Sequence, residues 1–459
     1  MSWRRILSLG AAESFFRHQA TVHAPEVIRG RLPWPLGSLL ILIVVLTNPW
    51  ALLLAVNEKT VGLGVCLMTI LWGFVSLLAV GFAAERVTRH LPYACSIAHW
   101  NSYRLANKGF TVAVSIASAA FQVLLLMVLV THAVLVTHDV RPIGESSGDS
   151  PSLLALFGSL VLTIAVVLLW GSRNPLRILA CTAGLFVLLL VPLALALDKH
   201  TQANAHNLLH MASLFGDSLQ RYQRYLVGFL IAFGTPCLLG FDSRLLQVAT
   251  SVRRSHLGYC FLLAGVIFLI ITPVLLLWLH FPSPAGPAAT TFRLALLALL
   301  TAAIALSLYA LAADWATLRF GFDDGFNVLD RIARAEDDKQ PEVASVLGNV
   351  GRVAFVATLV GALLVDAVFW VLTLLRLDGT ADKLLLPGAA VIALSFGPPL
   401  YLSLWRRAPS KSWISSLLIC LVALVLQVFG WLDHEFASGN FQFYFFVTSL
   451  PLFILAWVV

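Results

Sequence analysis

Long apolar runs are the feature that most constrains this chain, because they recur about twelve times along it. A helix needs about 20 consecutive apolar residues to cross the hydrocarbon core of a bilayer. Charged residues supply roughly a quarter of an ordinary soluble domain, whereas they make up only 12% of this chain. With so little material for a water-facing surface, the sequence predicts an all-α polytopic membrane protein with about twelve transmembrane helices.

The predicted spans fall into two sets that are separated by short polar links. The first set lies at about 33–56, 60–83, 109–138, 152–171, 177–197 and 225–248, and the second at about 258–280, 291–318, 353–375, 385–405, 413–432 and 441–459. No connection exceeds about 35 residues, so no sizeable soluble domain is expected. We divide the chain into a cytoplasmic N-terminal segment (1–32) that has the composition of an interfacial helix, a ten-helix core (33–405) and two additional transmembrane helices (406–459).

The distribution of basic residues predicts the orientation in the membrane. With the N-terminus inside, 22 of the 30 Lys and Arg residues fall in the inner segments, as the positive-inside rule requires. Both termini are therefore expected in the cytoplasm, and a bacterial inner membrane is the expected location. The net charge of +7 is then explained by the basic residues of the inner loops. It does not indicate nucleic-acid binding, because the aromatic residues lie inside the apolar runs and are not interleaved with Lys and Arg as a base-stacking surface requires.

The sequence shows no sign of a metal centre or a catalytic centre. The six cysteines are scattered singly, without a C-x-x-C pair, so neither a metal site nor a disulfide framework is predicted. A membrane enzyme needs a cluster of acidic, His or Arg residues on a sizeable interfacial loop, and the outer loops contain no such cluster. We therefore expect a protein that is not an enzyme.

Two of the predicted spans contain a break in the middle. The first contains Thr47-Asn48-Pro49, and the sixth contains Gly234-Thr235-Pro236 with Gly240 beyond it. Proline removes a backbone donor, and freed backbone groups at membrane depth are tolerated only where protein or a polar cavity satisfies them. Each broken span begins a block of five helices, and because five is odd the second block has inverted topology.

A single proline in a membrane helix is often only a kink. Two breaks at equivalent places in an inverted repeat instead favour a binding site formed by discontinuous helices. On this interpretation Thr47, Asn48 and Thr235 lie beside a bound solute or ion.

Three stretches resemble the sodium:solute symporter superfamily, which has the LeuT-type inverted-repeat fold. LLGFDSRLLQVATSVRRSHLGYCFLLAGVIFLIITPVLLL is similar to its sixth and seventh core helices, LALLTAAIALSLYALAADWATLRF to its eighth, and LPYACSIAHWNSYRLANKGFTVAVSIASAAFQVLLL to its linker and third helix. The resemblance is closest to the symporter-like membrane modules of some sensor histidine kinases. It is spread over about 35–405.

The resemblance implies a sodium site and also shows a departure from it. The family binds sodium with backbone carbonyls at the first-helix break and two adjacent hydroxyls on the eighth helix. That hydroxyl pair maps to Leu306 and Ser307, so only Ser307 is retained as a candidate ligand. Sodium is the one ion that the resemblance implies, and no other cofactor is expected.

Several polar residues lie within apolar runs away from the breaks. Asp366 is a candidate to bind a proton or cation, because intramembrane carboxylates are costly and usually face a cavity or a partner. A structural role is the alternative, in which Asp366 pairs with a neighbouring helix or lies near the outer interface. Gln122 is expected to hydrogen-bond across helices. Asp242 and Asp314 are placed toward the cytoplasmic ends of their helices, where water is expected to solvate them. Because Asp242 lies near the sixth-helix break, a role in gating the inner side is the alternative for that residue.

Two functions are consistent with these features. The first is a secondary active transporter that moves a small solute by alternating access, coupled to sodium or protons. The second is a non-transporting, symporter-like subunit that acts as a sensor or scaffold for a protein partner in a membrane complex. The expected partners are the lipid bilayer and a small solute, with a protein partner in the second case and no nucleic acid in either.

Overall fold

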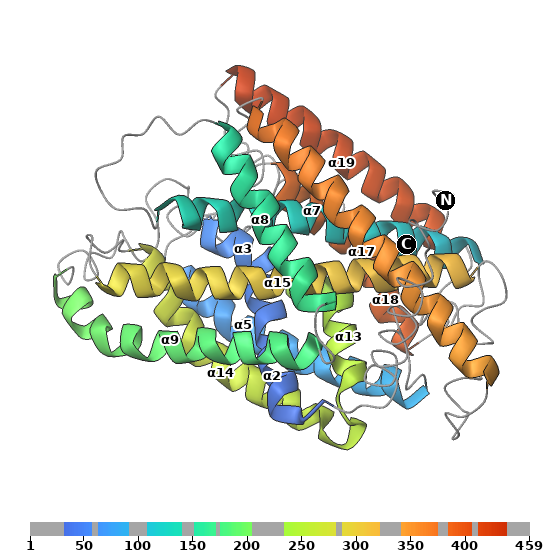
Figure 1. Cartoon of the computed structure of the whole chain (residues 1–459), viewed down its shortest axis with the longest axis horizontal. Coiled ribbons are helices and arrows are strands. Elements are labelled where there is room, and N and C mark those ends of the chain that lie inside the picture. Colours follow the sequence, from blue (N-terminus) through green and yellow to red (C-terminus); the bar gives the residue numbers. More distant parts are fainter. Residues whose placement is uncertain are drawn as a thin grey trace, which may run out of the picture.

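The computed structural model describes residues 32–56, 63–90, 108–139, 151–170, 175–203, 234–280, 287–321, 341–374, 384–405 and 412–437. These residues are helical apart from short connections (Figure 1). The helices are α2 (Trp34–Leu46), α3 (Pro49–Val56), α5 (Leu63–His90), α7 (Lys108–Asp139), α8 (Pro151–Trp170), α9 (Pro175–Ala203), a segment at 234–240, α13 (Ser243–Ser251), η1 (Arg254–His256), α14 (Leu257–His280), α15 (Pro287–Gly321), α17 (Pro341–Leu374), α18 (Leu386–Trp405) and α19 (Ser412–Ala437).

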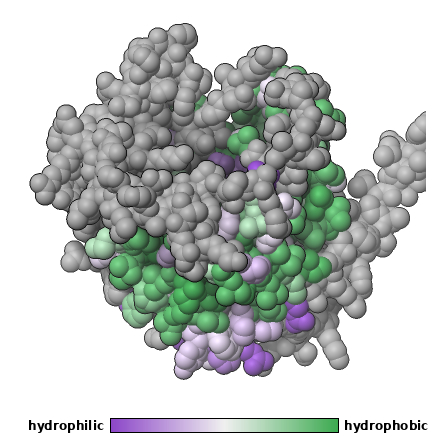
Figure 2. Space-filling model, turned by 90° about the vertical axis from the view of Figure 1, so that its left-hand side faces the viewer, coloured by the Kyte–Doolittle hydropathy of each residue, from purple (hydrophilic) through white to green (hydrophobic). Residues whose placement is uncertain are grey.

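Helix lengths and surfaces match a membrane protein. Within the described residues, seven helices are long and apolar enough to cross a bilayer. Large apolar side chains are exposed along them, with Leu188 on α9 at 68% and Leu363 on α17 at 60%. Figure 2 shows hydrophobic residues gathered across the described part of one face, with hydrophilic residues at its lower edge. Such an apolar exterior is stable only against lipid.

The helix contacts reveal two equivalent halves. One half runs from α2/α3 through α5, α7 and α8 to α9, and the other from 234–251 through α14, α15 and α17 to α18. Corresponding helices pack on each other: α5 on α14, α7 on α15, and α8 on α17. Other contacts come in reciprocal pairs, since α15 contacts α9 as α7 contacts α18, and α2 contacts α14 as α13 contacts α5. This pairing is what an internal two-fold repeat produces.

Small residues allow corresponding helices to approach closely, which drives helix association in lipid. On α5, a Cβ added at Gly81 would lie 2.7 Å from the ring of Phe261 on α14. On α14, a Cβ added at Gly265 would lie 2.7 Å from the ring of Phe74 on α5. Each of the two helices therefore places a glycine against a phenylalanine ring of the other.

The structure confirms that the first and sixth helices are broken, and within the described residues the sixth is interrupted after Gly240. The first break separates α2 from α3 at Thr47-Asn48, as predicted. In the sixth, residues 234–240 are helical and include Pro236, so the described break lies beyond Gly240, at Phe241-Asp242. Pro236 is the third of these described helical residues, and a side-chain cap at Asp242 starts the next helix. Residues 1–31 of the predicted N-terminal segment (1–32) and the twelfth span at 441–459 lie outside the described residues.

Candidate functional site

The first break forms because Pro49 cannot donate a backbone hydrogen bond and is favoured at the first position of a helix. Helix α2 ends with the Thr47 amide donating to Ile43 O at 3.0 Å. Helix α3 starts as the Ala51 amide donates to Asn48 O, also at 3.0 Å. The Thr47 carbonyl and the Asn48 side chain are thereby left to bond outside the helices, and both residues are fully buried.

The second break is built around a helix cap. The side chain of Asp242 accepts a 3.1 Å hydrogen bond from the Arg244 amide at the start of α13, which satisfies one of the otherwise unbonded donors of a helix N-terminus. Before the break, the Phe241 amide donates to Cys237 O at 2.9 Å. This hydrogen bond fixes the Asp242 carboxylate at the N-terminus of α13, directly at the break.

Arg244 and Asp242 form a fully buried ion pair. Nη2 of Arg244 lies 2.6 Å from Oδ2 of Asp242, and both side chains have 0% exposure. Nε of the same guanidinium donates to Oδ1 at 2.9 Å, so the contact is bidentate. Removing two charges from water is expensive, and the pair holds only where further hydrogen bonds satisfy the remaining groups.

Those further bonds connect Arg244 to two other helices. Nη1 donates to Oγ1 of Thr47 at 3.1 Å and to Oγ of Ser307 at 3.2 Å. Nη2 also donates to the main-chain oxygen of Thr47 at 3.3 Å. The guanidinium therefore lies between the first break, the second break and α15, with every nitrogen bonded to an oxygen.

Asn48 joins the two breaks directly. Its Nδ2 donates to Asp242 Oδ2 at 3.0 Å and to the Leu238 carbonyl at 3.1 Å. Its Oδ1 accepts from the Trp50 amide at 3.4 Å. We call Thr47, Asn48, Asp242, Arg244 and Ser307 the break cluster.

A second group of polar residues extends from the break cluster toward α7. Nε2 of Gln122 donates to Asp242 Oδ1 at 3.3 Å and to Ser243 Oγ at 3.1 Å. Oδ2 of Asp314 accepts from Ser243 Oγ at 3.1 Å and from Ser118 Oγ at 2.6 Å. Within the described residues, Oδ1 of Asp314 and Oε1 of Gln122 have no hydrogen-bond partner.

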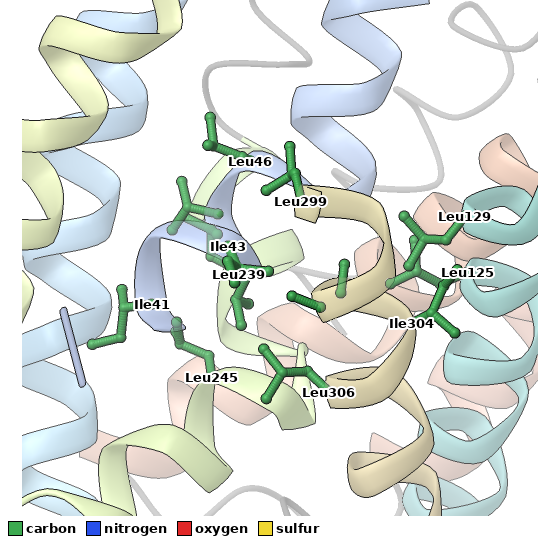
Figure 3. Packing of buried hydrophobic residues seen from close by; sticks show 14 of the residues in the cluster. Ile41, Ile43, Leu46, Leu125, Leu129, Leu239, Leu245, Leu299, Ile304 and Leu306 are labelled. Atoms are coloured by element: carbon green, nitrogen blue, oxygen red, sulfur yellow. The ribbon is translucent and has the colours of Figure 1, made fainter. Parts of the chain in front are cut away.

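Apolar packing encloses these polar groups. Phe241 stacks on Phe396 of α18 at a centroid distance of 6.1 Å and meets Phe121 of α7 edge-on at 5.7 Å. Figure 3 shows residues of α2, α7, α13 and α15 packed together in the same region. Leu306, which stands where the resemblance expects a hydroxyl, is buried on the side of α15 that faces α13 (Figure 3).

The structure brings together three of the five predicted site residues. Thr47, Asn48 and Ser307 belong to the break cluster. Thr235 is buried on segment 234–240, ahead of the second break. Asp366 lies apart on α17, where Oδ1 accepts a 2.6 Å hydrogen bond from Ser159 of α8.

Sequence reasoning misses the charged centre of the cluster. It assigns no role to Arg244 and expects Asp242 and Asp314 in water, yet the three are at most 1% exposed. These expectations are wrong because the charges are satisfied by protein groups instead of water. The prediction for Gln122 is correct, since it bonds across helices to Asp242. No group of three His, Cys, Asp or Glu residues in the described ranges is placed to hold a metal ion.

The same architecture occurs in solved structures. A Na+-coupled sialic acid symporter, in a substrate-bound outward-open state, matches with a TM-score of 0.60 at 12% identity, covering 98% of this chain and 95% of that one. MhsT in complex with L-phenylalanine gives a TM-score of 0.49 at 18% identity, over 87% of this chain and 98% of that one. No protein-family model and no curated protein sequence matches the chain.

The match to the sialic acid symporter establishes the fold. The chain is a polytopic, all-helical membrane protein with the inverted-repeat architecture of that symporter. That structural neighbour is a transporter. The resemblance to kinase-linked membrane modules stays a prediction from the sequence.

Proposed function

We propose that this protein is a secondary active transporter that moves a small solute across a cell membrane by alternating access, coupled to sodium or protons. The observation that carries this proposal is the meeting of two helix breaks at a buried polar cluster. Discontinuous helices present unpaired backbone groups and helix ends to a substrate, and a protein that needed only stability would gain little from them in lipid. The fold shared with a Na+-coupled symporter supports the same conclusion.

In the proposed transporter, the site lies around the break cluster. Thr47, Asn48 and Ser307 surround the ion-binding position, and Thr235 lies on the helix that leads into it. We leave Asp366 out of the site, since its carboxylate is bonded to Ser159 between α8 and α17. The proposed ten-helix core (33–405) contains every residue of the cluster. Of the two additional helices in 406–459, the described one, α19, packs on α18.

The positive-inside distribution supports a bacterial inner membrane with both termini in the cytoplasm. The lipid bilayer and a small solute are then the required partners. An accessibility assay with membrane-impermeant reagents on terminal tags would check this orientation.

Uptake into proteoliposomes tests the transport proposal. The purified protein is reconstituted, and the uptake of radiolabelled amino acids, sugars and carboxylates is followed under an imposed pH gradient and, separately, a sodium gradient. We expect one class of solute to accumulate above empty liposomes, and Asn48→Ala to remove that accumulation. Gln427→Ala is a matched control, because Gln427 is a buried amide on α19 that bonds the Leu384 carbonyl at 2.9 Å outside the cluster.

A non-transporting subunit is the second candidate, and the filled cluster favours it. Arg244 bonds to both breaks and to α15, and one hydroxyl expected on α15 is replaced by Leu306. A scaffold could retain such a fixed centre while it docks a protein partner. If Asn48, Thr235 and Ser307 tolerate alanine without loss of any cellular phenotype, while loop substitutions do not, the subunit function is correct and the transporter proposal is wrong.

A further inference from the structure

We propose that the guanidinium of Arg244 is a built-in cation that occupies the position of a coupling ion between the two helix breaks, so that the wild-type protein binds no sodium there. The placement of this cation does not depend on whether the chain transports a solute. Its consequence for coupling rests on the proposed function: solute movement would be independent of a sodium gradient.

The atoms around Arg244 are those that a hard cation requires. Such ions are bound by several oxygens from carboxylates, carbonyls and hydroxyls. Arg244 is bonded to two carboxylate oxygens of Asp242, the carbonyl and hydroxyl oxygens of Thr47, and the hydroxyl of Ser307. These oxygens come from three separate elements and meet at one cationic group, at distances of 2.6 to 3.3 Å.

Thr47 shows that its oxygens are oriented toward this cation. The hydroxyl of Thr47 donates its proton to Ile43 O at 2.7 Å. Its lone pairs are therefore directed away from α2, and Nη1 of Arg244 donates to them at 3.1 Å. The same hydroxyl would serve equally as a ligand to a metal cation if the guanidinium were absent.

Charge balance also opposes a second cation at this place. Asp242 carries one negative charge and Arg244 one positive charge, and both are fully buried. Asp314 belongs to the second group of polar residues, toward α7, and it is bonded to Ser118 and Ser243 and not to Arg244. A sodium ion among the Thr47 and Ser307 oxygens would lie against the guanidinium, and repulsion between like charges is strong at short range in a medium of low dielectric constant.

The arginine is specific to the break and not a general basic feature of this region. Arg253 and Arg254 follow shortly after on the same part of the chain, and both are exposed. Arg244 alone of the three points into the protein, at 0% exposure. Arg253→Ala therefore removes an equal charge without touching the oxygens of the cluster.

Sodium binding to the purified full-length protein in detergent tests the inference. Radiolabelled sodium binding and the apparent melting temperature are measured in sodium chloride and in choline chloride at equal ionic strength. Wild type and Arg253→Ala are expected to show no saturable binding and equal melting temperatures in the two salts. Arg244→Ala is expected to gain saturable binding and to melt about 3 °C or more higher in sodium chloride, because a ligand that binds only the folded state stabilises it.

Each comparison has an outcome that overturns the inference. Saturable sodium binding by wild type that Ser307→Ala reduces would show that the guanidinium does not fill the site. A folded Arg244→Ala protein without any sodium effect would show that the oxygens do not form a cation site. Adding Asp242→Asn to Arg244→Ala should weaken binding at least tenfold, and undiminished binding would place the ion elsewhere.

A variant that does not fold and a protein that takes up no solute are treated separately. If Arg244→Ala fails to fold, the wild-type binding curve decides alone, since a flat curve supports the inference and a saturable one overturns it. Solute uptake is read separately: sodium-driven uptake by wild type would overturn the built-in cation while supporting transport. An absence of uptake of every solute would count against transport and leave the binding result unaffected.

Discussion

Asn48 donates a 3.0 Å hydrogen bond from its side chain to Oδ2 of Asp242, a residue 194 positions further along the chain. This bond connects the two helix breaks at a point where both residues are at most 1% exposed. The second connection at the breaks is made by Arg244, which bonds Thr47. Farther along, the Leu32 amide donates to Ser251 O at 3.0 Å, which joins the start of α2 to the end of α13. The broken helices are therefore fixed to each other at two levels.

Replacing Asn48 should weaken the protein in a graded way. Asn48→Ala removes a donor from the buried carboxylate of Asp242, and leaving such a group undersatisfied costs about 1–3 kcal/mol. Asn48→Asp should be worse, because it places a second carboxylate against the first. The apparent melting temperature in detergent, followed by tryptophan fluorescence, should fall in the order wild type, Asn48→Ala, Asn48→Asp. An Asn48→Ala protein as stable as wild type would show that the bond to Asp242 contributes nothing to stability.

The ion pair should show strong coupling in a double-mutant cycle. Removing one partner of a buried pair costs about 3–5 kcal/mol, because the other charge is left without compensation. Arg244→Ala and Asp242→Ala are each expected to lower the melting temperature strongly, while the double variant should lose less than the sum of the two. Strict additivity would contradict a direct interaction. Arg244→Lys should fall short of wild type, since an ammonium cannot reproduce the bidentate contact.

The first break can be predicted from the sequence because its cause is local. Pro49 lacks a donor and follows two short polar residues in the middle of an apolar run, and this local pattern favours a helix end there. At Pro236 the described residues begin only at Gly234, so the break predicted there stays a prediction. A proline limits the hydrogen bonds of the preceding turn only, and surrounding helices decide whether the chain breaks.

The second break depends on a long-range effect. A charge near the cytoplasmic end of a span is expected in water, and this expectation fails for Asp242, which pairs with Arg244. In the structure they neutralise each other inside the protein. The one signal in the sequence is their spacing, since an Asp directly before a helix caps it and an Arg two residues later can reach the same carboxylate.

The rotation of each span about its own axis also cannot be predicted from the sequence. Ser118 and Gln122 are four residues apart on α7 and so share one face. Only the packing of α7 against α15 shows that this face meets Asp314 and Asp242. Hydropathy gives the depth of a polar residue but not its neighbours.

Gly397 should tolerate no side chain, because α18 approaches segment 234–240 very closely. A Cβ at Gly397 would lie 2.6 Å from Cβ of Cys237 and 3.1 Å from its Cα. Gly397→Ala is therefore expected to cost about 1–3 kcal/mol through overpacking. Gly258→Ala is the matched control: that helical glycine has open space around it, and alanine there should stabilise by about 0.5–1 kcal/mol. Melting temperatures that move in the same direction for both variants would contradict this packing.

Asp366 should be dispensable for any activity of the break cluster. Its carboxylate accepts a hydrogen bond from Ser159, which also accepts a 3.1 Å bond from the Trp370 indole nitrogen. Asp366→Asn keeps an acceptor for Ser159, so we expect near-normal stability and unchanged solute uptake in proteoliposomes. Loss of uptake in a well-folded Asp366→Asn protein would return this residue to the functional site.

Asp314 allows the contribution of charge to be separated from that of hydrogen bonding. Two hydroxyls donate to its Oδ2, while Oδ1 has no partner among the described residues. Asp314→Asn keeps an acceptor for Ser118 and Ser243 and removes a buried ionisable group whose printed hydrogen bonds come from hydroxyls. Asp314→Ala leaves both hydroxyls without that acceptor, which should cost about 1–3 kcal/mol. We therefore expect the Asn variant to melt at or above the wild-type temperature and the Ala variant below it. If the Asn variant is as unstable as the Ala variant, the negative charge itself stabilises the fold, and a cation must lie close enough to Asp314 to balance it.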